Sequence, residues 1–347
     1  MTTRVGVNLL WMVPGVVGGS EDATVRMLAG IADQVDRGGD GPEVVLFVLP
    51  SFAKAHPGLA RRFECVVAPV DGRSKPRRVL AESTWLPRTA GRLGVDLVHH
   101  AGGVVPPRNR ERETVTVHDL QPLDLPGNFA FAKRMYLRRV LKPSVHRAEV
   151  VAVPSEFTRG RVIDLLGADP DRVEVVPWAT PPPPSPGAAI RASLPARLDG
   201  RQVVLYPAIT YPHKNHLVLL DAMSAAVAQR PELFLVLIGG GGSSEHEVLE
   251  RISRPDLRDC VLRLGRVPEA TRDALYARAS LVVVPSRYEG FGLPALEAMA
   301  AGVPVVVADS GALPEVVPPG VPRVGPDDVA GWAAAITALA GDPARRA

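Results

Sequence analysis

Two glutamates eight residues apart, in a glycine-rich setting, are the residues of this sequence best placed to do chemistry. Glu289 precedes the turn Gly290-Phe291-Gly292, and Glu297 follows in the first turn of an apolar helix. Carboxylates suit pairs of sugar hydroxyls, because their two oxygens accept two donated hydrogen bonds. Glycine amides at a helix N-terminus suit phosphate. A ligand that carries both groups is a nucleotide sugar.

The elements on either side of this turn must position the two glutamates. Apolar Ala279–Val284 has the length and β-branched content of a buried strand, and Pro294 suits the first position of a helix. Gly302 ends that helix, and Val303–Val307 supplies the next strand. The segment therefore predicts one βαβ unit of a parallel sheet, where ligands bind at the carboxyl ends of the strands.

The whole stretch resembles a known signature. Pro-Ser-x-x-Glu289-Gly-Phe-Gly-Leu-Pro-x-Leu-Glu297-Ala-Met-Ala is similar to the signature of the retaining glycosyltransferases of family four. The resemblance covers almost the whole chain and is greatest to mannosyltransferase-like members of bacterial polysaccharide biosynthesis. It implies an α/β protein of the GT-B fold, with two Rossmann-like doubly wound domains facing an interdomain cleft.

The resemblance also implies roles for residues of the second half. Glu289 would hold hydroxyls of the donor sugar and Glu297 the ribose 2′ and 3′ hydroxyls. Lys214 would contact the donor phosphates, the alternative being an ordinary surface lysine. The main-chain amides near the turn would bind sugar or phosphate oxygens, and two residues after a strand would line the base pocket; these donor-binding candidates are Gly290, Phe291, Gly292, Leu293, Arg266 and Val267.

One position departs from the family pattern. Many relatives carry a second cation five residues before this lysine, where the present chain has Ile209. Neutralisation of the donor diphosphate would then depend on Lys214, the amides near Phe291, and His213 or a residue of the other domain.

Two features of the first half resemble the family as well. Gly18 and Gly19 are similar to the glycine loop that lies close to the donor phosphates and the acceptor, although two glycines before a helix are also ordinary turn residues. His118, with Asp119 as its expected structural partner, matches the His-Asp at the edge of the cleft. A histidine there suits sugar-hydroxyl bonding or proton handling. The catalytic candidates are thus His118, Lys214 and Glu289.

Length and composition predict two domains. The chain has 347 residues, against a soft prior of about 150 per domain, and 46% of them are hydrophobic. A proline cluster begins at Pro181, and such a run favours an extended linker. We therefore predict an acceptor-side domain over 1–178, a linker over 179–199 and a nucleotide-sugar-binding domain over 200–347. Relatives usually continue with a helix that crosses back onto the first domain, so either this member closes its domains differently or the sequence is truncated.

Strand candidates occur on both sides of the linker and alternate with helical patterns, as in doubly wound α/β domains. The clearest helices are expected over 216–228, 269–279 and 327–339. The predicted strands are Arg4–Asn8, Glu43–Leu49, Glu64–Ala68, Asp96–His99, Thr114–Val117, Glu149–Val153, Val173–Val176, Val203–Tyr206 and Leu233–Ile238, with others near Val261 and Leu281.

Charge and targeting signals limit the partners. A net charge of +3 is too small to indicate nucleic acid. The N-terminus shows no signal-peptide pattern, and no apolar run reaches the ~18 residues that span a bilayer. Cys65 and Cys260 lack metal-ligand spacing and are expected as reduced thiols. We expect a cytoplasmic protein, with peripheral contact to the inner face of the membrane as an option.

Several other motifs have ordinary explanations. Asp169-Pro-Asp171 resembles an acidic metal triplet but has the composition of a turn, so neither a metal nor a cofactor is expected. Gly239–Gly242 fails the dinucleotide fingerprint, because its third glycine is replaced by Ser244. The arginines around Arg73–Arg78 and Arg134–Arg139 read as solvated faces, with an anionic acceptor or lipid headgroups as the alternative.

The predicted function is transfer of a hexose, with retention, from a nucleotide-diphosphate sugar to a saccharide, lipid-linked or natural-product acceptor. GDP-mannose is the favoured donor. The alternatives are a nucleotide-sugar epimerase or phosphorylase of the same architecture, and a non-catalytic sugar-nucleotide-binding protein. A glycoside hydrolase would also use two carboxylates, but phosphate-binding features surround both glutamates.

Overall fold

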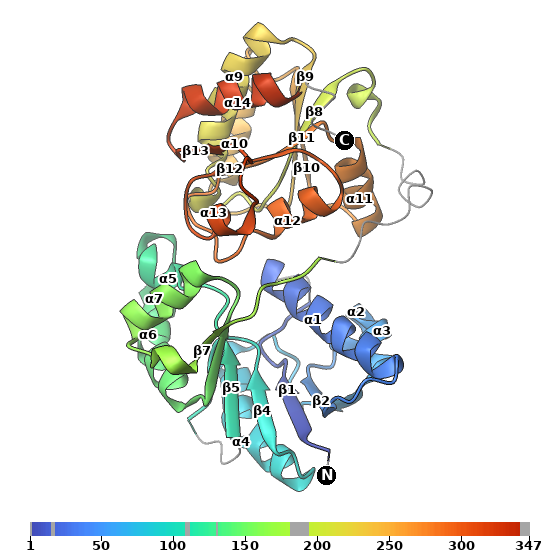
Figure 1. The fold of residues 1–347 in the computed structure, drawn as a ribbon, viewed down its shortest axis with the longest axis vertical. Helices are drawn as coiled ribbons and strands as arrows, with labels where there is room; N and C mark the ends of the chain where they lie inside the picture. Colours follow the sequence, from blue (N-terminus) through green and yellow to red (C-terminus); the bar gives the residue numbers. More distant parts are fainter. Residues whose placement is uncertain (1, 15–17, 108–111, 130, 181–193, 341–347) are drawn as a thin grey trace. The chain divides into compact units, whose positions relative to one another are not determined.

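The chain forms two compact units, Met1–Ala179 and Thr180–Ala347 (Figure 1). The computed structural model describes residues 2–14, 18–107, 112–129, 131–180 and 194–340. The division falls where the proline cluster begins, although residues 181–193 of the predicted linker lie outside the described ranges. Each unit is an α/β domain built on a parallel sheet, so the predicted fold class is confirmed.

The first unit contains a seven-stranded sheet of order β3-β2-β1-β4-β5-β6-β7. All its neighbouring strands pair in parallel. The strands are β1 (Arg4–Asn8), β2 (Glu43–Val48), β3 (Glu64–Val67), β4 (Leu97–His100), β5 (Arg112–Thr116), β6 (Val150–Val153) and β7 (Val173–Val175).

The second unit contains a six-stranded parallel sheet of order β10-β9-β8-β11-β12-β13. Its strands are β8 (Gln202–Pro207), β9 (Leu233–Ile238), β10 (Val261–Gly265), β11 (Leu281–Val284), β12 (Val305–Ala308) and β13 (Arg323–Val324). The sequence predicted β8, β9, β11 and β12 to within two residues at each end and placed β10 near Val261, but it did not predict the two-residue edge strand β13.

Helices connect the strands and cover the sheets. In the first unit they are α1 (Gly19–Asp36), α2 (Phe52–Ala55), α3 (Pro57–Arg62), α4 (Lys75–Arg92), α5 (Gln121–Asp124), α6 (Phe131–Arg147) and α7 (Glu156–Leu166). In the second unit they are α9 (His216–Gln229), α10 (Glu245–Ile252), α11 (Glu269–Arg278), α12 (Leu293–Ala300), α13 (Leu313–Val316) and α14 (Val329–Ala340).

Each sheet has one point where the strand order reverses direction. In the first sheet this point lies between β1 and β4, and in the second it lies between β8 and β11. The loops that leave the carboxyl ends of the two flanking strands run in opposite directions, and a crevice that binds ligands forms between them. The strand order therefore marks two edges at which functional residues should gather.

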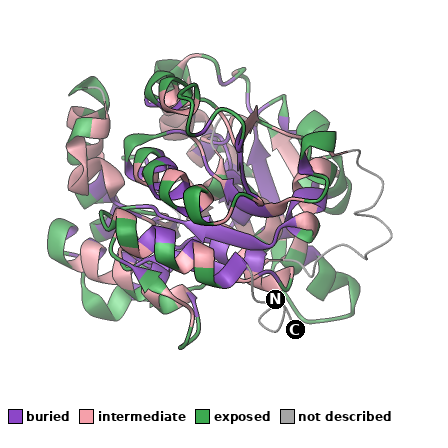
Figure 2. Ribbon diagram, turned by 90° about the horizontal axis from the view of Figure 1, so that it is seen from above, coloured by how far each residue is buried: buried purple, intermediate pink, exposed green. Residues whose placement is uncertain are grey.

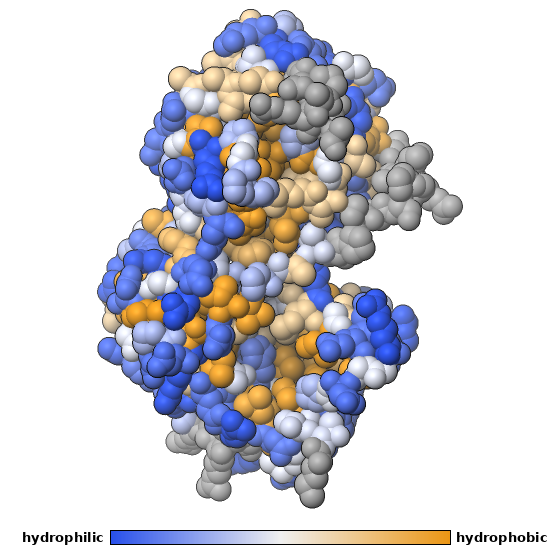
Figure 3. Space-filling model, viewed as in Figure 1, coloured by the Kyte–Doolittle hydropathy of each residue, from blue (hydrophilic) through white to orange (hydrophobic). Residues whose placement is uncertain are grey.

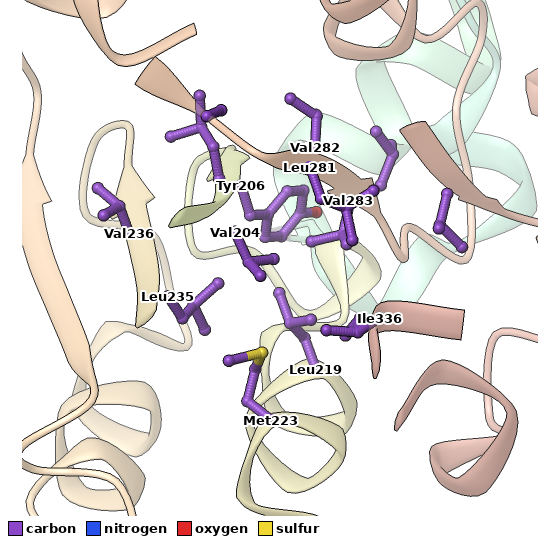
Figure 4. Packing of buried hydrophobic residues seen from close by; sticks show 14 of the residues in the cluster. Val204, Tyr206, Leu219, Met223, Leu235, Val236, Leu281, Val282, Val283 and Ile336 are labelled. Carbon is purple, nitrogen blue, oxygen red and sulfur yellow. The ribbon is translucent and has the colours of Figure 1, made fainter. Parts of the chain in front are cut away.

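The strands form the centre of each unit. In Figure 2 the central strands are buried, and the surrounding helices are buried on one side and exposed on the other. Figure 4 shows one such layer in the second unit, where Leu219 and Met223 of α9 and Ile336 of α14 lie beside Val204 and Leu235. Apolar burial of this kind is the main stabilising contribution to such a sheet.

The surface is mixed in character. Hydrophilic residues cover most of the outer surface of each unit in the view of Figure 3, with hydrophobic residues in smaller groups between them. Within the described ranges, none of the helices has both the length and the apolar character needed to span a bilayer. Cys65 and Cys260 are both free thiols.

Candidate functional site

A mostly buried ion pair of the second unit lies at the switch point of its sheet. Lys214 follows β8 and Glu289 follows β11, and these two strands pair directly. Nζ of Lys214 donates to Oε1 of Glu289 at 2.6 Å. The lysine side chain is 20% exposed and the glutamate 11%. The parallel sheet thus brings the two main sequence candidates of this unit into one ion pair.

The loop that carries Lys214 is tied to its neighbours. Asn215 has a φ of 61°, a left-handed conformation that reverses the chain before α9. Its Nδ2 donates to the carbonyl oxygens of Pro285 at 3.1 Å and Pro326 at 2.6 Å. The amide of Arg287 donates to the carbonyl of His213 at 2.8 Å. The β8 and β11 loops are therefore held as one rigid surface.

A buried tyrosine holds the same loop through a hydrogen bond. Tyr206, at the end of β8, donates its hydroxyl to the carbonyl of Lys214 at 2.6 Å and lies 3.1 Å from Oγ of Ser286. Burial first, and then the charge of Glu289, raise the pKa of this hydroxyl well above its usual value. Tyr206 therefore stays protonated and acts as a fixed donor. Sequence analysis did not select it, because a tyrosine in a strand reads as core.

The backbone of Glu289 is clamped by the loop after β12. The amide of Ala312 donates to the carbonyl of Glu289 at 3.1 Å. Gly311 has a φ of 58°, and a β-carbon at that position would lie 2.8 Å from the same carbonyl oxygen. Only glycine allows this approach without a shift. Gly311 was visible in the sequence, but its contact across the sheet was not.

The second glutamate of the signature has a different partner. The hydroxyl of Tyr276 on α11 donates to Oε2 of Glu297 at 2.9 Å. Because α12 begins at Leu293, with Gly292 as its N-cap, Glu297 falls in the second turn of the helix rather than in the predicted first turn. Gly290, Phe291 and Gly292 lead from Glu289 into α12, which begins at Leu293, and the donor-binding role predicted for these four residues stays a prediction.

Arg266 and Val267 follow β10, two strands away from β8. A β-carbon at Gly240 would lie 3.8 Å from Nη2 of Arg266 and 4.0 Å from Cγ1 of Ile209. The guanidinium group therefore lies over the glycine loop, next to the residue that follows β8. Val267 packs against the hydrophobic core. The base-pocket role predicted for these two residues stays a prediction.

The run Gly239–Gly242 has a packing role. A β-carbon at Gly239 would lie 2.4 Å from the carbonyl oxygen of Ala208, and one at Gly242 would lie 2.6 Å from that of Thr210. The β9 loop can therefore lie directly on the β8 loop. The amide of Gly242 donates to Oγ1 of Thr210 at 2.7 Å, which fixes the contact. The glycines serve close loop packing, which is consistent with their failure to match a dinucleotide fingerprint.

Burial disfavours the charged form of His213. The pKa of His213 is lowered to about 3, first by burial and then by the charge of Lys214. The ring is therefore neutral near pH 7 in this structure, and a contribution of His213 to a diphosphate site stays a prediction.

A cavity of about 270 Å³ lies against the start of α9, and Tyr211, Ser244 and Arg287 are among the residues that line it. Neither Lys214 nor Glu289 lines it. The cavity and the ion pair are thus separate features of the second unit.

His118 lies at the carboxyl edge of the first sheet, just after β5. Its Nε2 donates to the carbonyl of Ala101 at 2.7 Å, which leaves Nδ1 as an acceptor. The ring is flanked by Trp11 and Trp178, with ring centroids 5.7 and 5.5 Å away. Burial lowers its pKa to about 4. His118 is therefore a neutral, oriented imidazole that could accept the proton of a hydroxyl group.

Asp119 has a structural task of its own. Its Oδ1 accepts a hydrogen bond from the amide of Gln121 at 3.0 Å, at the start of α5. This local contact explains its presence as a turn residue before a helix. The structural partnership predicted between Asp119 and His118 stays a prediction.

The glycine pair opens α1 at the same edge of the first sheet. Gly18 is the N-cap, with a φ of 85°, and its carbonyl accepts from the amide of Glu21 at 2.8 Å. Gly19 is the first helical residue. A left-handed N-cap requires glycine at position 18, so turn geometry accounts for one glycine of the pair.

The acidic triplet behaves as a turn. Oδ1 of Asp169 accepts from the amide of Asp171 at 3.1 Å and caps a short 3-10 helix. Among the described residues, no three His, Cys, Asp or Glu side chains are grouped as metal ligands. The interpretation of Asp169-Pro-Asp171 as a turn is confirmed.

Two doubly wound α/β domains, each built on a parallel sheet, are the architecture of the GT-B glycosyltransferases. Residues 18–181 match the family model described as Glycosyltransferase Family 4. Residues 201–342 match the model described as Glycosyl transferases group 1. The chain belongs to this family of glycosyltransferases.

Curated relatives are similar over part of their length. The chain is 31% identical over 226 residues to an O-antigen chain mannosyltransferase B of Escherichia coli, covering 64% of this chain and 59% of the relative. It is 32% identical over 277 residues to a D-inositol 3-phosphate glycosyltransferase of Segniliparus rotundus, covering 75% and 58%. The chain therefore spans less than two thirds of these relatives.

Solved structures share the fold over nearly the whole chain. HepE of Anabaena, in complex with UDP and glucose, superimposes with a TM-score of 0.74 at 20% identity, covering 99% of this chain and 91% of that one. Sucrose-phosphate synthase of Thermosynechococcus elongatus gives 0.75 at 22% identity, with the same coverage. Both likenesses confirm the GT-B architecture.

Proposed function

We propose that this protein is a retaining, metal-independent hexosyltransferase that takes its sugar from a nucleotide-diphosphate donor. The observation that carries the proposal is the Lys214–Glu289 ion pair at the switch point of the second sheet, next to the glycine turn of α12. A cation suits the diphosphate and a carboxylate suits the sugar hydroxyls. Both charges lie on loops that other contacts hold rigid.

The ion pair has a defined use in the reaction. When the bond from the anomeric carbon to the diphosphate breaks, negative charge grows on the leaving phosphate. Lys214 would exchange Glu289 for this phosphate, and Glu289 would then accept hydrogen bonds from the sugar. Arg266, beside Gly240, is a second cation of the same unit. Fixed cations that act where charge develops are a large part of catalysis in such sites.

The acceptor side of the proposal rests on His118. The acceptor hydroxyl must lose a proton, and the neutral imidazole offers Nδ1 as an acceptor for it. The acceptor is a saccharide, a lipid-linked molecule or a natural product. A cytoplasmic location, with peripheral contact to the inner face of a membrane, belongs to the same proposal, since both cysteines are free thiols.

The proposed donor is GDP-mannose. The mannose assignment is supported by relatives named as O-antigen chain mannosyltransferases, in Escherichia coli and Salmonella typhimurium. UDP is the competing nucleotide, because it occupies the similar HepE structure. The names of relatives thus support mannose, while the base needs a direct test.

A thermal-shift screen of GDP, UDP, dTDP and ADP tests the donor. A ligand that binds only the folded protein raises its Tm, and a concentration of 100 times Kd contributes about 2.7 kcal/mol. We expect GDP to give the largest shift and Lys214→Ala to reduce it. An equal or larger shift of the Tm with UDP would contradict the assignment of GDP-mannose as the donor. No shift with any of the four nucleotides would contradict the proposed function as a whole.

Product analysis separates transfer from epimerisation. A transferase releases nucleoside diphosphate when an acceptor is added, whereas an epimerase converts the nucleotide sugar alone. We expect release that depends on acceptor. A changed nucleotide sugar without acceptor would favour the epimerase, and binding without any turnover would favour a non-catalytic protein.

A further inference from the structure

Two tryptophans that have no part in the proposed chemistry lie on either side of His118. Trp11 follows β1 and Trp178 follows β7, so both lie, like His118 after β5, at the carboxyl edge of the first sheet. The ring centroids of the two indoles lie 5.7 and 5.5 Å from that of the imidazole. Aromatic rings attract each other at separations of about 4.5–7 Å. We call these three residues the aromatic group.

The Nδ1 atom of His118 is closed off within this group. Nδ1 is buried without a hydrogen-bond partner among the described residues, and so is Nε1 of Trp11. Burial is also the largest cause of the lowered pKa of the imidazole. Nδ1 is the atom to which we assign the proton of the acceptor hydroxyl. A hydroxyl group can therefore reach it only after a neighbouring side chain has moved.

Trp11 is the fixed member of the aromatic group. A β-carbon at Gly102 would lie 2.4 Å from Cγ and 2.8 Å from Cβ of Trp11, so this side chain lies directly on the main chain of Gly102. The preceding residue, Ala101, supplies the carbonyl that accepts the hydrogen bond from Nε2 of His118. Trp11 can therefore move little without displacing the main chain that orients the imidazole.

Trp178 is the member that can move. β7 ends at Val175, and Trp178 lies in the irregular segment between this strand and Ala179, the last residue of the first unit. Trp178 is only partly buried. Its indole meets the imidazole at 61°, in an edge-to-face arrangement. Side chains of irregular surface segments are less constrained than those of packed elements. Displacement of Trp178 is thus the easiest way to uncover Nδ1.

The proposed reaction gives such a cover a function. When the bond from the anomeric carbon to the diphosphate breaks, its electron pair goes to the phosphate. The oxygen of the acceptor hydroxyl bonds to the anomeric carbon, and the proton of that hydroxyl goes to Nδ1 of His118. Water carries the same O–H group and is far more abundant than any acceptor. If water reached Nδ1, the products would be free sugar and nucleoside diphosphate.

We propose that Trp178 covers Nδ1 of His118 and is displaced by the acceptor but not by water, so that it determines whether the sugar is transferred or hydrolysed. The inference rests on the function proposed above and adds a residue that selects between the two nucleophiles. A large acceptor makes many contacts, and their free energy can move one side chain. A water molecule has no such binding energy. Trp178 acts through His118 and is therefore a positioning residue.

Hydrolysis of the donor by the whole chain, without an acceptor, tests this role. The probes are GDP-mannose and UDP-glucose, and free sugar is quantified per molecule of protein that binds nucleotide, so that misfolded protein does not count. Trp178→Ala and Trp178→Leu remove the indole, whereas Trp178→Phe keeps an aromatic ring. Trp85→Ala is the matched control, because it removes an indole of the same unit whose recorded ring contact is with Phe47.

The space left by the indole should admit water, because it borders two buried polar atoms and exceeds the roughly 30 Å³ that one water molecule occupies. We expect Trp178→Ala to hydrolyse the donor at least about tenfold faster than the unmodified protein, since a general base contributes about 10²–10⁴-fold. Trp178→Leu should also hydrolyse it faster. Trp178→Phe and Trp85→Ala should stay close to the unmodified rate. Adding His118→Ala to Trp178→Ala should abolish the increase.

Three results would overturn the inference. They are an unchanged rate in both Trp178→Ala and Trp178→Leu, an equal increase in Trp85→Ala, and an increase that persists after His118 is removed. The last two would show that a loosened first unit, rather than an uncovered Nδ1, admits water. If nucleotides bind and one of these results is found, only this inference fails. If no nucleotide shifts the Tm of the unmodified protein, the proposed function fails first.

Discussion

Lys214 and Glu289 are 75 residues apart in the chain and 2.6 Å apart in space. Each is mostly buried, so each needs the other while no ligand is bound. An unpaired charge at such a site costs more free energy than the pair gains. The contact is thus a structural element, and in the proposed function its two charges would bind the donor.

The first prediction separates these two roles. Lys214→Ala should lower kcat/KM by about 10²–10³-fold, as expected for loss of a group that stabilises developing charge. It should also lower the free energy of unfolding by about 1–3 kcal/mol, because Glu289 is left without its partner. Adding Glu289→Gln should recover most of the stability and none of the activity. Urea denaturation and release of nucleoside diphosphate measure the two quantities.

Lys54→Ala serves as the control, since Lys54 is exposed on α2 of the first unit. It should change neither quantity. Turnover that returns in the double variant would show that Lys214 acts only as a structural partner of Glu289.

The second prediction concerns His118. Its pKa is lowered to about 4, from an ordinary value of 6.5, so the imidazole stays neutral and able to accept a proton down to about pH 4. The acid side of the rate profile should therefore show no loss near pH 6.5 due to this residue. His118→Ala should reduce acceptor-dependent release of nucleoside diphosphate by about 10²–10⁴-fold. The thermal shift with nucleotide should not change.

His246→Ala is the matched control, because His246 is exposed on α10. An inflection near pH 6.5 that disappears in His118→Ala would contradict the role given to the buried ring.

At the scale of elements, loops rather than helices or strands position the site. The β8 loop holds Lys214, the β11 loop holds Glu289, and the β12 loop clamps the glutamate backbone. The sheet only sets where these loops begin. Asn215 and Gly311 both have a positive φ, and each lies where one loop of the site contacts another.

The third prediction uses two glycines with similar backbones and different surroundings. Gly311 and Gly302 have φ values of 58° and 67°, but a β-carbon at Gly302 meets open space, whereas one at Gly311 meets the Glu289 backbone. Gly302→Ala should cost about 1–2 kcal/mol of unfolding free energy from the left-handed conformation alone. Gly311→Ala should cost more and should also weaken nucleotide-sugar binding.

Chemical denaturation and donor titration of the two variants check this difference. Equal effects on both quantities would mean that the contact between Gly311 and Glu289 does not position the glutamate.

At the scale of the whole molecule, buried histidines make stability depend on pH. The pKa is lowered to about 4 in His99 and His118, and to about 3 in His213 and His216, with burial as the largest cause. The unfolded chain binds these protons below about pH 6.5, while the folded chain does not. The contribution of these histidines to the free energy of unfolding is therefore complete above pH 6.5 and is lost as the pH falls toward their folded-state pKa values.

The two units should differ in this respect. Glu82 of the first unit has a pKa raised from 4.5 to about 7. Its contribution to the free energy of unfolding is therefore complete below pH 4.5 and is lost as the pH rises to 7. This opposes the histidines of the same unit. The second unit, with His213 and His216, should be the more sensitive to acid.

The fourth prediction follows from this balance. As the pH falls from 6.5 to 5, each buried histidine should lower the unfolding free energy by about 1.1 kcal/mol per pH unit on average, because the unfolded histidine is half protonated at pH 6.5 and almost fully protonated at pH 5. His216→Gln should reduce the decrease in unfolding free energy between pH 6.5 and 5 by about the contribution of one histidine. His246→Gln should leave this decrease unchanged. Denaturation curves at pH 6.5 and 5 measure the difference. A slope that is identical in all three proteins would contradict the burial of His216 as its cause.

The sequence alone determined the two-domain α/β class, nearly every strand and the Glu289–Glu297 motif. These features are local. A short window of sequence is enough to recognise an apolar run of strand length, a glycine at a turn or a fixed spacing between two residues. It could not determine that the pKa of His213 is lowered, that Asp119 accepts a hydrogen bond from the amide of Gln121, or that Gly311 lies against the backbone of Glu289. Nor could it select Tyr206, whose function depends on a contact with the Lys214 carbonyl.

These properties depend on the tertiary structure. Burial sets a pKa and an ion pair requires proximity, and both depend on which strands become neighbours in the sheet. Lys214 meets Glu289 because β8 and β11 pair at the switch point. Trp11, His118 and Trp178 become neighbours because β1, β5 and β7 end at one edge of the first sheet. The chain supplies these groups separately, and only the folded sheets bring them together.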